Sequence, residues 1–599
     1  MGARSVKWAA LLAVLCVAAT GAWAEDEPLT GDATREYLLD EVPNFPTIIR
    51  DQWSNRIPTS PFETQRSNYG LLRENLPERP ITLTESIALA LQHNTGLRIQ
   101  ALNPVSAAAQ VRKAYSQFDP EFFGDASKQR VNTPVQTISP FTNEDPDAGG
   151  GEQPSLFSDQ VDWNAGLRKR LLTGGLLAGS WTNSRLSTNP TVVNQVNPDY
   201  VTGLNLSINQ PLLRDFGWRF ALLVVDVAQI GEEQSYQIYK AQVAGLVENV
   251  ERAYWTYVLA IESTRVQQRG LDLAKELLRQ NQSRFNVGSL PRTAVLESEA
   301  EVARREADLV RSSALQRIAR DNLRALINAR QEDDEALIMI APADEPAVTT
   351  TVFDLDESLR VAYVQRPELL AARANVDGRG VERKIAENRL LPRFDLVGSL
   401  GLNGLGGDNA GVLPTPAPDA TPNPFGNFIP NPQVLGGYSR SLELLTDGRY
   451  YQYLIGAQLV IPLDNASAKA DYAQAKVNSE SARLSLLQTE ENVTLEITQA
   501  VNNLKALLRR IDATRVAREL AEENVRNQQA RYDVGLATTK DLIDFQDRLT
   551  QAEQAEVEAV AAYAIELARL HFAEGTLLER RSVALDRTPQ EDAPWWARF

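Results

Sequence analysis

Few residues of this chain have the types and spacing that enzyme chemistry requires. Asp541 and Asp544 are three positions apart in a segment expected to be helical, so both carboxylates lie on one helix face. A hydrolase that uses only carboxylates would need such groups, but the sequence indicates no pocket for a substrate. The simpler interpretation is a pair of solvated acids near a helix start, where the helix dipole favours them. A carboxylate-only enzyme is possible but unsupported, and no catalytic role is assigned to this pair.

Other catalytic groups are scarce. Cys16 is the only cysteine, and the two histidines, His93 and His571, each stand alone in helical sequence. These residues form no Cys/His metal cluster, thiol nucleophile or Ser-His-Asp triad. We therefore expect neither catalytic residues nor a metal or other cofactor. The formal charge of −17 argues against a nucleic-acid-binding protein, which needs a basic face.

The N-terminus has the pattern of a secretory signal. Arg4 and Lys7 precede an apolar run, and Ala22–Trp23–Ala24 is a small-x-small cleavage site, so residues 1–24 are expected to be removed. Cys16 would allow a lipoprotein, but Leu15 occupies the position where a lipobox needs Ala or Gly. No segment after residue 24 has the ~18 consecutive apolar residues of a transmembrane helix. Entry into a membrane would then require a barrel.

The chain contains an internal duplication. The segment Ile81–Ala90 returns as Phe353–Ala362, and Arg284–Gly288 returns as Arg531–Gly535. Two long copies predict two similar structural units rather than a solenoid of short repeats. We divide the chain into a signal peptide (1–24), a proline-rich arm (25–80), a first repeat (81–340), a second repeat (341–580) and a C-terminal tail (581–599).

Each repeat contains β-strands with two different faces. Apolar and polar positions alternate over Tyr200–Ile208 in the first copy and over Phe394–Leu402 and Tyr451–Ile461 in the second. Nine or so alternating residues suit a tilted transmembrane strand, although a soluble β-sandwich has the same alternation. A further hairpin, Val161–Leu171 and Leu176–Asn183, would give six strands per chain instead of four. Long loops are expected over 131–158 and 405–449.

Long helices surround these strands. We expect a helix over 83–117, and rods over 220–286 and 466–533, which contain no proline; about 65 helical residues would span roughly 100 Å. Return helices follow over 293–328 and 539–574. Ala300, Ala303, Ala307, Val310 and Ala314 predict a coiled-coil seam in the first return helix. An ordinary coiled coil would explain the seam, but it would not explain the strands.

A glycine lies at each rod's end. Glycine allows a helical chain to reverse and leaves backbone exposed for a close partner, while a turn glycine with no partner is the simpler interpretation. The two end segments have matching order and are Val287, Gly288, Ser289 and Leu290 in the first copy and Val534, Gly535, Leu536 and Ala537 in the second.

The duplicated order resembles the TolC-like outer-membrane efflux proteins, also called outer membrane factors, over roughly residues 81 to 575. The matching features are the segments Leu83–Ser86 and Leu355–Ser358, the two glycine turns, and the prolines between helices and strands, Pro120, Pro211, Pro392 and Pro462. The resemblance implies an α+β membrane protein: a homotrimer whose strands form a shared outer-membrane β-barrel, continued by a long periplasmic α-helical barrel.

The resemblance also implies function. It implies a passive exit duct, not an enzyme, for a tripartite efflux pump or type I secretion, with a periplasmic adaptor protein and an inner-membrane RND or ABC pump as partners. The two glycine turns would contact the adaptor, and Asp541 and Asp544 would ring a periplasmic constriction. Ala294 and Ala537 replace an aspartate and an arginine that brace the closed state in the family's best-known member. We therefore do not expect the same contacts to hold this chain closed. The alternative is a soluble periplasmic coiled-coil scaffold.

Overall fold

A computed structural model describes residues 78–134, 155–188, 196–327, 339–348, 353–409 and 433–585. The predicted signal peptide, most of the predicted arm and the end of the predicted tail lie outside the described residues. Chain contacts separate two units, and all described residues except Leu585 fall in the unit Arg73–Ala584. Within this part of the chain, no helix is both long and apolar enough to cross a membrane.

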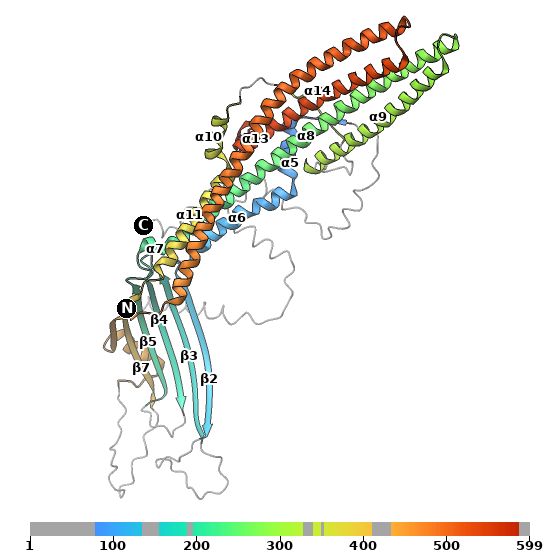
Figure 1. The fold of residues 1–599 in the computed structure, drawn as a ribbon. Helices are drawn as coiled ribbons and strands as arrows, with labels where there is room; N and C mark the ends of the chain where they lie inside the picture. The colour runs from blue at the N-terminus through green and yellow to red at the C-terminus, as the bar shows by residue number, and fades with distance from the viewer. Residues whose placement is uncertain are drawn as a thin grey trace, which may run out of the picture. The chain divides into compact units, whose positions relative to one another are not determined.

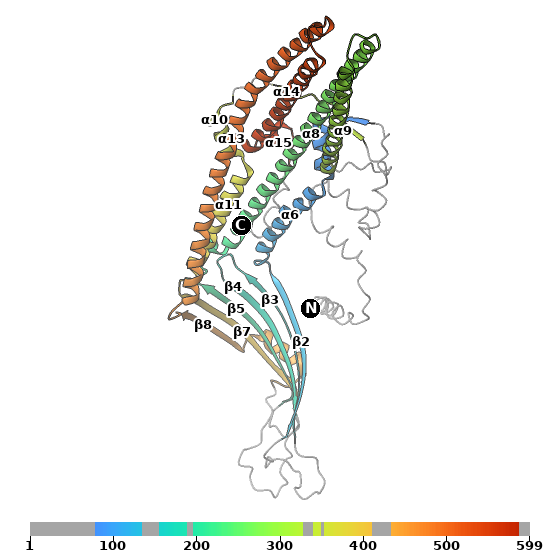
Figure 2. The same cartoon turned by 45° about the vertical axis from the view of Figure 1, so that its right-hand side comes forward.

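Six antiparallel strands form the main sheet, in the order β2-β3-β4-β5-β7-β8 (Figures 1 and 2). They are β2 (Glu121–Pro134), β3 (Ser155–Arg170), β4 (Leu176–Thr188), β5 (Val196–Pro211), β7 (Arg393–Asn409) and β8 (Tyr451–Val460). The additional hairpin predicted in the first copy is therefore present as β3 and β4. Gly174, with φ of 89°, forms its turn, where a side chain would be strained.

The two faces of the sheet differ in polarity. Strand register places Phe122, Leu167, Leu206, Leu400 and Tyr453 in one row across the strands, and each is more than half exposed. The neighbouring row, one residue along each strand, lies on the opposite face and is mainly small or polar: Phe123, Gly166, Ser180, Asn205, Gly401 and Gln452. Where its own chain leaves this apolar face uncovered, the face needs another apolar environment.

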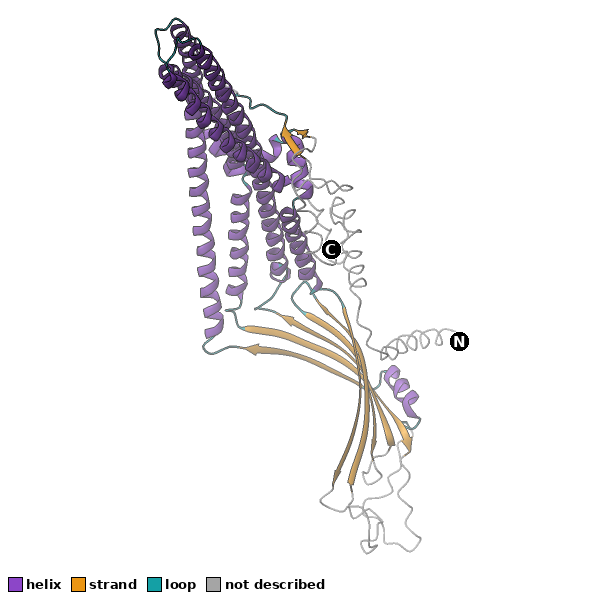
Figure 3. Cartoon of the chain, turned by 90° about the vertical axis from the view of Figure 1, so that its right-hand side faces the viewer, coloured by secondary structure: helices purple, strands orange, loops and turns teal. Residues whose placement is uncertain are grey.

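Long helices continue from one end of the strands (Figures 1 and 3). Helices α6, α8, α11 and α13 pack side by side in that order, and α8 and α13 each fold back into a return helix, α9 and α14. Their bounds are α6 (Thr95–Ser116), α8 (Leu223–Asn286), α9 (Arg292–Ile327), α11 (Pro367–Asn388), α13 (Ala466–Asp533) and α14 (Thr539–Glu574). Both rods and both return helices were predicted within three residues.

Short elements complete the fold. Strands β1 (Glu78–Ile81) and β6 (Met339–Pro342) form a parallel pair, so the last three residues of the predicted arm belong to a strand instead. The short helices are α5 (Leu83–His93), α7 (Trp218–Ala221), α10 (Leu355–Gln365), α12 (Gly437–Asp447) and α15 (Leu577–Arg580).

The predicted continuous helix over 83–117 is wrong, because the chain breaks at Asn94 between α5 and α6. The Asn94 side chain accepts a hydrogen bond from the backbone N–H of Leu97 at 2.9 Å and so caps α6. Asparagine favours such caps over helix interiors because its side chain competes for backbone groups. Periodicity alone did not reveal this break.

The predicted loops are shorter than expected. Strands β2 and β3 extend into the first loop, and α12 forms inside the second. α12 is amphipathic, with Ser441, Leu444 and Leu445 buried. It packs on the apolar face of β5 and β7, where buried Thr202 donates a hydrogen bond to the carbonyl of Ser441 at 3.1 Å. Gly404 permits this close approach, since a Cβ there would lie 2.0 Å from that carbonyl oxygen.

Candidate functional site

The two helix ends that the sequence singled out have the same turn. Gly288 and Gly535 both have φ of 77°, and the residue after each donates its N–H to the carbonyl five positions earlier, Ser289 to Arg284 and Leu536 to Arg531. This is the Schellman arrangement, in which a left-handed glycine ends a helix. We call the segments 287–290 and 534–537 the two tips.

Apolar side chains are exposed at the tips. Val287 is 78% exposed, Val534 70% and Leu536 71%, while Leu290 and Ala537 are partly buried. Exposure of apolar valine and leucine side chains to water is unfavourable. These side chains are therefore available to contact a partner.

A buried polar cluster joins the two hairpins close to the tips. The Tyr532 hydroxyl donates to Oδ1 of Asn281, and Nδ2 of Asn281 donates to Ser298 Oγ at 2.7 Å and to Thr539 Oγ1 at 3.5 Å. The four residues come from α13, α8, α9 and α14, and each is less than 5% exposed. Fully satisfied buried networks of this kind fix the geometry of a core.

Arg284 adds an outer contact to this cluster. Its guanidinium lies 4.9 Å from the ring centre of Tyr532 and 2.8 Å from Oδ1 of Asp533. The sequence indicated only that Ala294 and Ala537 cannot provide the brace of the family's best-known member. It contained no local signal for Asn281, because Asn281 and Tyr532 are 251 positions apart.

The acidic pair lies at the start of α14. Asp541 closes a capping box: its carboxylate accepts from the Thr538 backbone N–H at 3.0 Å, and its own N–H donates to Thr538 Oγ1 at 3.2 Å. These hydrogen bonds hold the pKa of Asp541 below its ordinary value. Asp544 is also exposed. Within the described part of one chain, no three His, Cys, Asp or Glu side chains are grouped to hold a metal ion.

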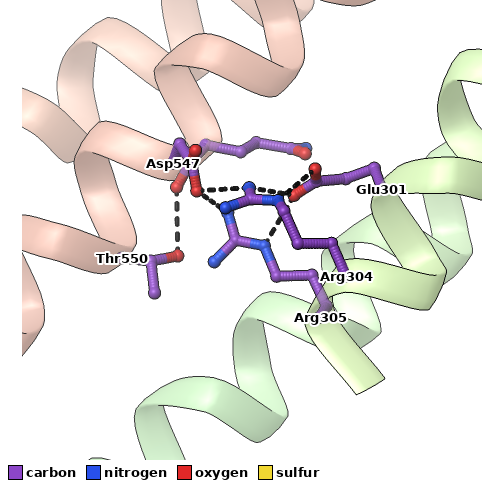
Figure 4. A network of polar contacts seen from close by, with 6 residues as sticks. Glu301, Arg304, Arg305, Asp547 and Thr550 are labelled. Atoms are coloured by element: carbon purple, nitrogen blue, oxygen red, sulfur yellow. Dashed lines mark hydrogen bonds and ion pairs between the residues drawn. The ribbon is translucent and has the colours of Figure 1, made fainter. Parts of the chain in front are cut away.

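An ion-pair network that the sequence analysis missed joins α9 to α14 (Figure 4). Arg305, whose side chain is 4% exposed, contacts Glu301 at 2.7 Å and Asp547; Arg304 contacts the same two carboxylates, each at 2.7 Å. The spacing of Glu301 to Arg304 and Arg305 permits pairs within one helix. The partner on α14 could not be read from the sequence.

Within one chain, the predicted seam of α9 is not the buried face of the helix, so its packing stays a prediction for the assembly. Ala300, Ala303, Ala307 and Val310 are exposed in the single chain. The buried stripe instead includes Ala294, Val295, Ser298, Glu301, Arg305, Ser312, Ala319 and Leu323. Glu301 and Arg305 can be buried because they form an ion pair. The face that contains them is therefore the one buried within the chain, whereas the spacing of small residues pointed to a different face of this helix.

The four prolines lie between helices and strands. Pro120 and Pro392 directly precede β2 and β7, Pro211 is the last residue of β5, and Pro462 lies between β8 and α13. Proline lacks a backbone donor and restricts the preceding residue, so it separates a helix from a strand at each position.

Comparison with known sequences places these features in a family. The model of the outer membrane efflux protein family matches residues 172–329 and 359–576, more than half of the chain. Outer membrane protein TolC of Escherichia coli (strain K12) is 26% identical over 390 residues, covering 64% of this chain and 71% of TolC. TolC of Vibrio cholerae serotype O1 is 23% identical over 382 residues, covering 63% and 77%.

Solved structures share the fold. The CmeC outer membrane channel of Campylobacter jejuni has a TM-score of 0.57 at 18% identity, covering 86% of this chain and 95% of CmeC. The open state of the MtrE outer membrane channel of Neisseria gonorrhoeae has a TM-score of 0.55 at 19% identity, covering 84% and 91%. The chain therefore belongs to the outer membrane efflux protein family, a family of TolC-like efflux channels rather than enzymes, located in the outer membrane with helices extending into the periplasm.

Proposed function

We propose that three copies of this chain form a passive exit duct, in which the sheets close into one outer-membrane β-barrel and the helices into a periplasmic α-helical barrel. The observation that carries the proposal is the exposed row Phe122, Leu167, Leu206, Leu400 and Tyr453. Lipid would cover this face, while the small and polar face would line the water-filled interior, as in other outer-membrane barrels.

Closure by several copies follows from the sheet edges. One copy has end strands β2 and β8, whose outer backbone groups have no strand partner within the described residues. Unpaired backbone groups in lipid cost several kcal/mol each, so a single open sheet cannot span the membrane. The soluble scaffold is the weaker candidate, because it gives no reason for an exposed apolar row on five of the six strands.

The tips are proposed as the contact for a periplasmic adaptor protein. Val287, Val534 and Leu536 give apolar contact area, and Gly288 and Gly535 leave the backbone accessible. The remaining residues of this surface are Ser289, Leu290 and Ala537. The adaptor would in turn connect the duct to an inner-membrane RND or ABC pump, in tripartite efflux or in type I secretion.

Asp541 and Asp544 are proposed to line the periplasmic constriction. Both are exposed in the single chain, at the start of α14 and near the tips. Threefold symmetry would bring six carboxylates around the pore, where they would favour cations and bind multivalent ones.

The two repeats, 81–340 and 341–580, are proposed as structural duplicates. Each has the helix order short, medium, rod and return: α5, α6, α8 and α9 in the first, and α10, α11, α13 and α14 in the second. The repeats differ in their strands, because the first contains four strands of the sheet and the second contains two. The proposed limits at 80/81 and 340/341 pass through the paired strands β1 and β6.

Fractionation of the expressed protein, followed by its mass in detergent and its conductance in a planar bilayer, tests the duct. The expected result is an outer-membrane species of three times the chain mass that conducts ions. A soluble, non-conducting monomer would contradict the proposal.

A further inference from the structure

We propose that α12 (Gly437–Asp447) lies in the headgroup layer of the outer leaflet, where it ends the lipid-covered part of the sheet. The inference rests on the proposed duct, because it takes the apolar face of the sheet as the face towards lipid. It adds where that face stops contacting lipid and which element ends the contact. Its basis is the packing of α12 on the sheet, the polarity of the helix and the spacing along two strands.

α12 is fixed on the apolar face, at the end of the sheet away from the rods (Figure 3). The hydroxyl of Tyr438 donates a hydrogen bond to Oδ1 of Asn183 at 2.9 Å. The Tyr438 ring also lies 5.4 Å from the ring of Trp163 and 5.9 Å from that of Tyr200. Strand register places these three contacts on the same face as Leu206. Since the rods extend into the periplasm, α12 lies towards the outside of the cell.

The sheet is adapted to this helix. Asn183 and Thr202 are polar residues on the apolar face, yet they are only 2% and 0% exposed. Both have hydrogen-bond partners on α12, Tyr438 and the carbonyl of Ser441. Gly406 adds to the close fit of Gly404, because a Cβ at Gly406 would lie 2.2 Å from the carbonyl oxygen of Gly437. The polar groups of the sheet at this level therefore need neither water nor lipid.

The side of α12 away from the sheet is polar. Glu443 pairs with Arg440 at 2.7 Å, and Asp447 pairs with Arg449 at 2.9 Å. Charged side chains on the lipid face of a barrel are costly at the middle of the membrane and much less costly near its surface. Hydrocarbon is therefore an unsuitable cover for this side of the helix, whereas the headgroup layer is suitable. The exposed stripe consists of Ser439, Glu443, Thr446 and Asp447.

The spacing along the strands agrees with this position. Eleven residue steps on β7 separate Gly404, under α12, from Arg393 at the helical end, and nine steps on β5 separate Thr202 from Pro211. A rise of about 3.3 Å per residue and a tilt of about 40° convert these steps to heights of about 28 Å and about 23 Å. The apolar band of outer-membrane barrels is about 25 Å tall. One hydrocarbon layer therefore fits between α12 and the helical end of the sheet.

Aromatic residues lie at both limits of this band. Tyr450 and Tyr451 follow α12 and are 43% and 63% exposed, while Phe216 and Trp218 follow β5 and are 51% and 62% exposed. The guanidinium of Arg219 lies 5.8 Å from the ring centre of Trp218. Exposed aromatic rings are typical of the two surfaces of a membrane, where a neighbouring arginine reaches the headgroups.

The apolar face changes character beyond α12. The row that contains Tyr200 also contains Lys128 and Arg185, and Arg130 lies in the next row on the same face. β8 begins at Tyr451, opposite Leu402, so it does not reach these rows. The ends of the longer strands are therefore expected to extend past the membrane surface into the water outside the cell.

Spin labels in the intact trimer test the position of α12. Single cysteines are introduced after Cys16→Ala, the change that removes the one native cysteine, and the labelled protein is reconstituted in vesicles of phosphatidylethanolamine and phosphatidylglycerol. Collisions with oxygen, which concentrates in hydrocarbon, are compared with collisions with a water-soluble nickel chelate. Leu206→Cys reports the apolar face, Asn205→Cys the opposite face of the same strand, and Glu443→Cys the outer side of α12.

The label at Leu206→Cys is expected to collide mainly with oxygen, and the label at Asn205→Cys mainly with nickel. The oxygen-to-nickel ratio at Glu443→Cys should be several-fold lower than that at Leu206→Cys. Equal ratios at these two positions would place α12 in hydrocarbon and overturn the inference while leaving the duct. A label at Glu443→Cys that neither reagent reaches would also overturn it, because another chain would then cover α12. Nickel access at Leu206→Cys equal to that at Asn205→Cys would instead overturn the duct.

A second variant tests whether the sheet fixes α12. Gly404→Val should displace the helix, because a Cβ there meets the carbonyl of Ser441, and the label at Glu443→Cys should become more mobile. Gly456→Val on β8 is the matched control, since a Cβ at Gly456 meets no atom closer than 3.8 Å, and the label mobility should stay unchanged. Equal mobility in both variants would show that the close fit at Gly404 does not hold α12, contrary to the inference.

Discussion

The hydroxyl of Tyr532 on α13 donates a hydrogen bond to Oδ1 of Asn281 on α8, and neither residue is more than 2% exposed. This contact connects the two helical hairpins where they approach the tips. Ala294 of α9 and Ala537 at the second tip have no polar side chains that could make such a contact. A different residue, on the opposite helix of the first hairpin, supplies the acceptor.

Replacing Tyr532 with Phe should loosen this connection. The change leaves a buried acceptor on Asn281 without its donor, which costs about 1 to 3 kcal/mol. We expect a lower melting temperature in detergent and a larger single-channel conductance, because the tips are held less tightly. Tyr363→Phe is the matched control, since Tyr363 bonds Thr494 at 3.1 Å away from the tips. Equal conductance changes in both variants would contradict the assignment.

Replacing Asp547 with Ala should separate α9 from α14. The change removes the only α14 carboxylate of the network while Glu301 still pairs with Arg304 and Arg305. Because Arg305 is buried, we expect a loss of about 1.5 to 3 kcal/mol in the free energy of unfolding. Glu558→Ala is the control: Glu558 faces Arg510 at 3.9 Å with both side chains about half exposed. An exposed pair contributes about 0 to 1 kcal/mol.

His571 should make stability depend on pH. Burial, and then the charges of Arg580 and Arg581, lower the pKa of His571 from 6.5 to about 4. The unfolded chain therefore takes up the proton first as pH falls, so the free energy of unfolding decreases between about pH 6.5 and 4, by at most about 3.4 kcal/mol. Melting temperatures measured across this range should fall less in His571→Gln. A fall of the same size in His571→Gln would contradict this role of His571.

A side chain at either tip glycine should destabilise the protein. Gly288→Ala or Gly535→Ala forces a residue with a Cβ into φ of 77°, at about 1 to 2 kcal/mol. Gly231→Ala, inside α8 with open space around it, should instead be neutral or stabilising by up to about 1 kcal/mol. Melting temperatures of the three variants would distinguish these outcomes. A stabilised Gly535→Ala would show that the left-handed turn is not formed.

Local rules predicted some parts of this fold and failed on others for physical reasons. The rods, the return helices and the β3–β4 hairpin follow from residue spacing and turn glycines, which act within a few positions. The buried stripe of α9 did not, because buried Arg305 pairs not only with Glu301 on its own helix but also with Asp547, a residue 242 positions away. The same limit applies to Asn281 and Tyr532. Contacts between the two repeats depend on tertiary packing, which periodicity does not encode.

The acidic pair can be tested by removing its charges. Asp541→Ala with Asp544→Ala should weaken block of the reconstituted pore by multivalent cations, because the proposed ring would lose all six carboxylates. Since Asp541 also caps α14, Thr538→Ala is needed to measure the loss of the cap alone, about 1 kcal/mol. Asp512→Asn, on an exposed face of α13, tests a charge change outside the proposed ring. Block that is unchanged in the double variant, or equally weakened by Thr538→Ala, would remove the pair from the constriction.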